Sequence, residues 1–64
     1  MSTPLNVAIA IDRLIADAKA RETAIDVSAS ADEIYLRYLA SGCSRHDIGQ
    51  ALEGEAAAAG VTIH

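Results

Sequence analysis

The amino-acid sequence predicts an all-α protein: a small bundle of three to four helices that forms one domain over residues 1–64. Three observations predict this class. Apolar side chains recur at helical spacing in three segments, capping residues precede those segments, and glycines follow two of them. We expect helices at about residues 4–22, 31–41 and 45–59.

The first helix is expected to begin at Thr3 and Pro4, as N-cap and first helical residue, because proline lacks only an N–H that would be unpaired there anyway. An apolar stripe at helical period follows: Val7, Ile11, Leu14, Ile15 and Ala18. A second apolar set, Leu5, Ile9, Ala16 and Ala20, lies on the opposite face. We expect residues 23–30 or the C-terminal VTI segment to cover this second face, or a second copy or a partner protein to bind it.

The second helix is expected to follow a capping box formed by Ser30 and Glu33, and to end before Gly42 in a left-handed conformation. Its predicted buried stripe is Ile34, Tyr35, Tyr38 and Leu39. The segment before it, residues 23–30, is a linker that Ile25 and Val27 should anchor to the core.

The third helix is expected to start after Ser44, with Asp47 in the reciprocal capping position. Its predicted buried stripe is Ile48, Ala51, Leu52, Ala56 and Ala59. Gly54 either lies inside one long helix or marks a turn before a short fourth helix, since glycine weakens a helix by about 1 kcal/mol relative to alanine. Gly60 ends the helical pattern, and Val61 and Ile63 follow in a tail that could fold back on the core.

Residues 36–52, LRYLASGCSRHDIGQAL, combine a Leu-rich helix end, a glycine, a serine cap and an acidic residue before an isoleucine. The positions that carry this pattern are Leu36, Leu39, Ala40, Gly42, Ser44, Asp47, Ile48 and Leu52. The stretch resembles the first two helices of the LuxR-type and sigma-region-4-type helix-turn-helix. The resemblance implies a helix-turn-helix-like fold, in which a recognition helix with polar and basic side chains would come next. This chain continues EGEAAAAGVTIH instead, with no Lys or Arg after Arg45.

Charge argues against direct nucleic acid binding. The net charge is −4, and from residue 30 onward only Arg37 and Arg45 oppose the acids Asp32, Glu33, Asp47, Glu53 and Glu55. A DNA-binding domain of this size is normally basic, because Lys and Arg neutralise phosphates. An acidic surface suits a basic protein partner or serves solubility.

The composition also limits chemistry and location. The single Cys43 forms no internal disulfide, which makes the cytoplasm the default location. With His46 it offers too few ligands for a closed zinc site, and we expect no metal, no cofactor and no enzymatic activity. The longest apolar run, VAIAI at residues 7–11, is too short to span a membrane, and no signal peptide pattern precedes it.

These observations favour a small acidic regulatory protein that binds and inhibits, by occlusion, a protein partner with a basic surface of the nucleic-acid-binding kind. Antiactivators of mobile elements and phage-encoded inhibitors, including anti-CRISPR proteins, belong to this class. The predicted partner-binding residues are Leu5, Ile9, Asp32, Glu33, Asp47, Glu53 and Glu55. One alternative is a DNA-binding regulator that dimerises through the first helix and reads DNA with Arg45, His46 and Gln50. Another is a structural or assembly subunit.

Overall fold

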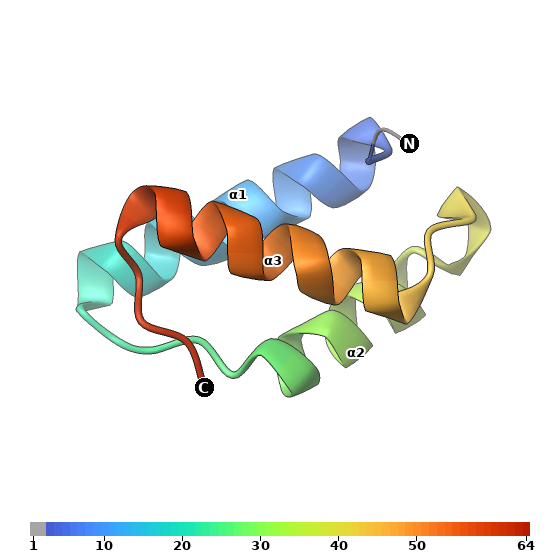
Figure 1. Cartoon of the computed structure of the whole chain (residues 1–64). Coiled ribbons are helices and arrows are strands. Elements are labelled where there is room, and N and C mark those ends of the chain that lie inside the picture. The colour runs from blue at the N-terminus through green and yellow to red at the C-terminus, as the bar shows by residue number, and fades with distance from the viewer. Residues whose placement is uncertain (1–2) are drawn as a thin grey trace.

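A computed structural model describes residues 3–64 and shows an all-helical protein (Figure 1). Three α-helices follow one another: α1 (Leu5–Arg21), α2 (Val27–Arg37) and α3 (Arg45–Ala59). A short 3₁₀ helix, η1 (Leu39–Ser41), connects α2 to α3. The all-α class is confirmed, and the described residues contain three α-helices rather than four because α3 continues through Gly54.

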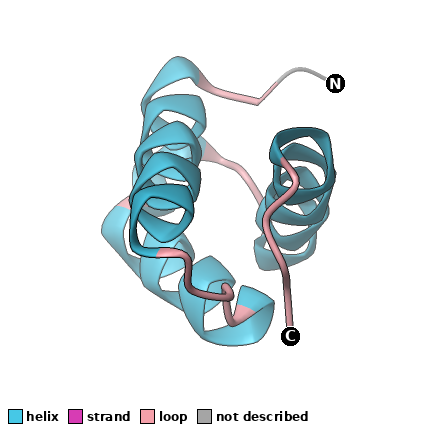
Figure 2. Cartoon of the chain, turned by 90° about the vertical axis from the view of Figure 1, so that its left-hand side faces the viewer, coloured by secondary structure: helices cyan, strands magenta, loops and turns pink. Residues whose placement is uncertain are grey.

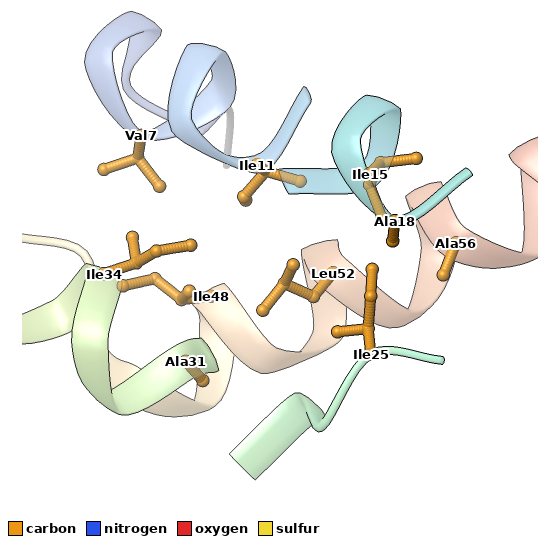
Figure 3. Packing of buried hydrophobic residues seen from close by; sticks show 10 residues of the cluster. All are labelled: Val7, Ile11, Ile15, Ala18, Ile25, Ala31, Ile34, Ile48, Leu52 and Ala56. Atoms are coloured by element: carbon orange, nitrogen blue, oxygen red, sulfur yellow. The ribbon is translucent and has the colours of Figure 1, made fainter. Parts of the chain in front are cut away.

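Helix α3 lies at the centre of the packing and contacts both α1 and α2. The core is made only of aliphatic side chains and alanines, which point toward one another from the three helices and from the α1–α2 connection (Figure 3). Its buried members are Val7, Ile11, Ile15, Ala18, Ile25, Ala31, Ile34, Ile48, Leu52 and Ala56. The predicted stripe of the first helix is thus confirmed, with Leu14 partly buried at its edge. Burial of these aliphatic groups is the main favourable term in folding.

The C-terminal tail folds back onto the segment between α1 and α2, as Figure 1 and Figure 2 show. Ile25 and Ile63 form an isolated parallel β-bridge. The Ile25 N–H donates to the Thr62 carbonyl at 2.9 Å, and the His64 N–H donates to the Ile25 carbonyl at 2.8 Å. Ile25 is 3% exposed. It anchors residues 23–30 to the core, as expected, and it is also the residue on which the C-terminal tail folds back.

Helix α1 begins one residue later than expected. Pro4 is its N-cap and makes no side-chain cap hydrogen bond, so the N-cap role predicted for Thr3 is wrong. The helix ends at Arg21, and its C-cap Glu22 adopts the left-handed conformation with φ 56°. The N–H groups of Glu22 and Thr23 donate to the carbonyls of Lys19 and Ala18 at 3.2 and 3.0 Å, a Schellman arrangement at a residue other than glycine.

Helix α2 is displaced by four residues relative to the prediction. Its N-cap is Asp26, whose carboxylate accepts a hydrogen bond from the Ala29 N–H at 3.0 Å, so the predicted Ser30–Glu33 capping box is wrong. Aspartate and serine cap about equally well, and the earlier cap leaves Val27 inside the helix beside α3. Tyr38 breaks the helix with φ −121°.

The predicted left-handed Gly42, with φ 77°, closes η1 instead of α2. Leu39, which was expected to be buried, lies in η1 and is 58% exposed. The reason is geometric: the break at Tyr38 ends the helical period that would have carried Leu39 to the core.

Helix α3 agrees with the prediction at both ends. The Ser44 hydroxyl accepts a hydrogen bond from the Asp47 N–H at 3.0 Å, and Gly60 ends the helix with φ 74°. In the part of the chain that the structure describes, no helix is both long and apolar enough to cross a membrane.

Candidate protein-binding surfaces

The outward face of α1 carries an apolar strip that stays exposed among residues 3–64. We call it the outer seam and define it as Leu5, Ile9, Ala16 and Ala20, all exposed. Leu5 is 76% and Ile9 43% exposed. The tail and residues 23–30 pack on each other around Ile25, away from this strip. Intramolecular cover, one of the two expectations, is therefore absent for the described residues.

A hollow of about 200 Å³ lies between α1 and α2, beside the outer seam. Its apolar lining includes Ile9, Leu14, Ile34 and Tyr38, and its charged lining includes Arg13, Glu33 and Arg37. Glu33 accepts a hydrogen bond from Arg37 Nη2 at 3.3 Å, one turn along α2. Such an exposed pair within one helix contributes only about 0.3–0.5 kcal/mol, so it neutralises charge more than it stabilises the fold.

The two predicted acidic residues of α2 are both paired with arginine. Glu33 pairs with Arg37, and Asp32 pairs with Arg45 at the start of α3. Arg45 Nη2 also donates to the Ser28 hydroxyl at 3.1 Å. These pairs reduce the charge that Asp32 and Glu33 present to a partner. They also neutralise Arg45, one of the three residues with which the alternative DNA-binding regulator would read DNA.

The three predicted acidic residues of α3 remain uncompensated. Asp47, Glu53 and Glu55 are exposed, and none takes part in an ion pair among residues 3–64. Asp47 stands in the first turn, where the helix dipole favours a negative charge.

Glu53 and Glu55 do not point the same way. Glu53 lines a hollow on the α2 side of α3 together with Val27 and Ala31. Residues two apart in a helix point roughly 200° apart, so Glu55 leaves α3 on the other flank. The structure therefore distributes these acids around the exposed perimeter of α3 instead of gathering the five acids in one patch.

The remaining residues that the sequence singled out for chemistry lie around the start of α3. Cys43 is half-buried in the turn before α3, where its N–H donates to the Ser41 hydroxyl at 3.2 Å, while His46 and Gln50 are exposed on α3. Among residues 3–64, no group of three or more His, Cys, Asp or Glu side chains is placed to hold a metal ion.

Two exposed leucines were missed as surface residues. Leu36 is 67% exposed on α2, and Leu39 is exposed on η1. The signal for Leu36 was available in the sequence, because a residue two positions from the buried Ile34 faces roughly 200° away from it on the same helix.

Asp12 and Arg13 of α1 were also not among the residues predicted to contact a partner. Both are exposed on either side of the outer seam, and neither takes part in an ion pair among the residues that the structure describes.

Comparison of the chain with models of protein families, with curated proteins and with solved structures found no match.

Proposed function

We propose that this chain is a non-enzymatic regulatory protein that binds a protein partner with a basic, nucleic-acid-binding surface and keeps nucleic acid away from it. The observation that carries the proposal is the charge of α3. Its three carboxylates, Asp47, Glu53 and Glu55, are exposed and unpaired within residues 3–64, while the charge of its single arginine is met by Asp32. Helix α3 thus presents negative charge where a DNA reader would present positive charge.

The mechanism is occlusion. Complementary charge speeds the encounter with a basic surface, and burial of apolar groups holds the complex. Leu5 and Ile9 are the exposed apolar residues proposed for contact, and the acids of α3 supply more of the attraction than the paired Asp32 and Glu33. Antiactivators of mobile elements and phage inhibitors such as anti-CRISPR proteins work in this general way, and we place the chain in that class, acting in the cytoplasm.

We also propose that α2, η1 and α3 form a helix-turn-helix-like unit that is used for protein binding. The support is local: the left-handed Gly42 and the Ser44 cap stand where the motif requires a glycine and a serine. The segment after α3 is the tail that pairs with Ile25, and it carries no Lys or Arg. Within residues 3–64, no basic helix follows α3 in the place of the recognition helix of the DNA-binding families.

The test is a binding and competition experiment. The wild-type chain captures its partner from the native host, and the partner's nucleic-acid binding is then measured by fluorescence anisotropy with increasing amounts of the chain. We expect the wild type to displace nucleic acid. The double variant Glu53→Lys/Glu55→Lys should bind several-fold more weakly, and the difference should shrink at high salt, because exposed charges are screened beyond about 8 Å at physiological ionic strength.

A matched control changes the same amount of charge elsewhere. Asp17 and Glu22 lie toward the end of α1, and Asp17 pairs with Arg21 only at the surface, at 3.1 Å. Asp17→Lys/Glu22→Lys should leave partner affinity nearly unchanged if α3 makes the contact. An equal loss of partner affinity in both double variants would mean that net charge, and not the position of the acids on α3, causes the effect. A nanomolar, sequence-specific complex with DNA in a mobility-shift assay would instead establish the DNA-binding alternative.

A further inference from the structure

A hollow of about 510 Å³ lies between the start of α2 and the first turns of α3, and it shares no residue with the outer seam. We call it the α2–α3 hollow. Its apolar lining is Val27, Ala31 and Gly49, and its charged lining includes Arg45 and Glu53. We propose that it receives one arginine side chain of the basic partner, with the aliphatic stem on the apolar lining and the guanidinium at the Glu53 carboxylate. This inference rests on the proposed function, which supplies the basic partner.

Gly49 keeps the α2–α3 hollow open. It lies inside α3, half-buried, and a Cβ added there would lie 3.9 Å from Val27 Cγ1 and 4.0 Å from the Ala31 Cβ. Both are ordinary van der Waals distances, so the packing of α2 against α3 accepts alanine, which is the better helix former. A side chain at this position would fill part of the hollow, whereas glycine leaves the apolar lining accessible.

The charges at the two ends of the hollow favour a cation at Glu53. Glu53 and Arg45 are eight residues apart, which is about 12 Å along α3 and beyond the screening length of about 8 Å at physiological salt. Glu53 takes part in no ion pair among residues 3–64, so its carboxylate is available to a ligand. The charge of Arg45 is met by Asp32, and Arg45 Nη2 donates to the Ser28 hydroxyl at 3.1 Å.

Arginine fits this combination of groups better than lysine. The guanidinium is planar and weakly hydrated, so it loses less free energy than an ammonium when it leaves water. It can donate two parallel hydrogen bonds to the Glu53 carboxylate, and the side-chain carbonyl of Gln50, which also lines the hollow, can accept another. The aliphatic stem of arginine covers apolar surface while its charged head stays at the solvent edge.

A titration without the partner tests the hollow by itself. N-acetylarginine amide is added to the isotope-labelled chain at constant ionic strength, and the backbone amide shifts are followed by NMR. We expect the largest shifts at Ala31, Gly49 and Glu53, with a dissociation constant on the order of 10 mM for so small a probe. N-acetylcitrulline amide, which has the same shape without the charge, should bind several-fold more weakly.

Three results of this titration would overturn the proposal. The first is equal affinity for the arginine and citrulline probes, and the second is a set of shifts that lies outside the hollow. The third is stronger binding of inorganic phosphate beside Arg45, which would show that the hollow takes an anion.

Filling the hollow tests its role in partner binding. Gly49→Leu should weaken partner affinity roughly tenfold, and the smaller Gly49→Ala should weaken it several-fold without lowering Tm. Gly54→Leu is the matched control, because it adds the same side chain to α3 where a Cβ meets nothing within 4 Å. It should leave partner affinity within about a factor of two. Circular dichroism confirms that each variant remains helical.

A second pair of variants separates the hollow from the general acidity of α3. Glu53→Gln and Glu55→Gln remove the same charge, but only Glu53 lines the hollow. Glu53→Gln should weaken partner affinity several-fold more than Glu55→Gln. Equal losses, or normal affinity in Gly49→Leu, would overturn the arginine site and leave the occlusion mechanism standing. A wild-type chain that does not displace nucleic acid would instead contradict the proposed function, whatever the arginine titration shows.

Discussion

The C-terminus of α1 offers a direct test of the backbone geometry, because two helices of this chain end in the same way with different residues. Glu22 and Gly60 are both left-handed, with φ 56° and 74°. Each is followed by a residue whose N–H reaches back into the last turn: Thr23 to the Ala18 carbonyl, and Val61 to the Ala56 carbonyl. Gly60 adopts this conformation without steric cost, whereas the Cβ of Glu22 crowds the following carbonyl oxygen.

We therefore predict that Glu22→Gly stabilises the fold. Relief of the left-handed strain contributes about 1–2 kcal/mol, and the greater chain entropy of glycine in the unfolded state removes about 0.5–1 kcal/mol of it. Removing a negative charge from a helix C-terminus adds about 0.3–0.5 kcal/mol. The sum is an increase of about 1 kcal/mol in the free energy of unfolding, or about 4–8 °C in Tm for a domain of this size.

The assay is thermal and urea unfolding followed by circular dichroism, with Glu22→Ala as the control. Alanine removes the charge but keeps the Cβ, so it isolates the electrostatic share, which should fade at high salt. The difference between the glycine and alanine variants isolates the backbone share, which salt should leave unchanged. A glycine variant no more stable than the alanine variant would show that Glu22 is not left-handed in solution.

Two further predictions concern the other helix signals. Asp26→Ala should lower the free energy of unfolding by about 1 kcal/mol because it removes the N-cap of α2, whereas Ser30→Ala, inside the helix, should change it by less than half as much. Urea unfolding of the two variants measures both changes, and a larger loss of stability in Ser30→Ala would show that Ser30, not Asp26, is the N-cap. Gly54→Ala should raise the free energy of unfolding by about 0.5–1 kcal/mol, because Gly54 is helical and an added Cβ meets nothing within 4 Å; a loss of stability on thermal unfolding would mean that α3 does not continue through this position.

The candidate surfaces were predicted unevenly by the sequence. Helical spacing alone assigned Leu5 and Ile9 to the face of the first helix opposite its core stripe, and the structure shows that both are exposed. The five acids were treated as one group, and the structure divides them into the paired Asp32 and Glu33 and the unpaired acids of α3. The pairing of Glu33 with Arg37 was accessible from their four-residue spacing, but that of Asp32 with Arg45 depends on how α2 packs against α3.

What the sequence by itself determined is what depends on neighbours within about four residues. The stripe of α1, the Ser44 cap, the left-handed Gly42 and Gly60 and the bounds of α3 all follow from helical period and capping chemistry.

Tertiary structure decided whatever required a choice between local signals of similar strength, or contact between distant segments. Asp26 and Ser30 cap about equally well, and the difference came from the packing of α2 against α3. The bridge between Ile25 and Ile63 and the exposure of Leu39 likewise depend on where each helix stops and on how it is rotated in the bundle. A local pattern fixes the faces of a helix, but only the assembled core fixes which face is covered, because burial depends on side chains that are far away in the chain.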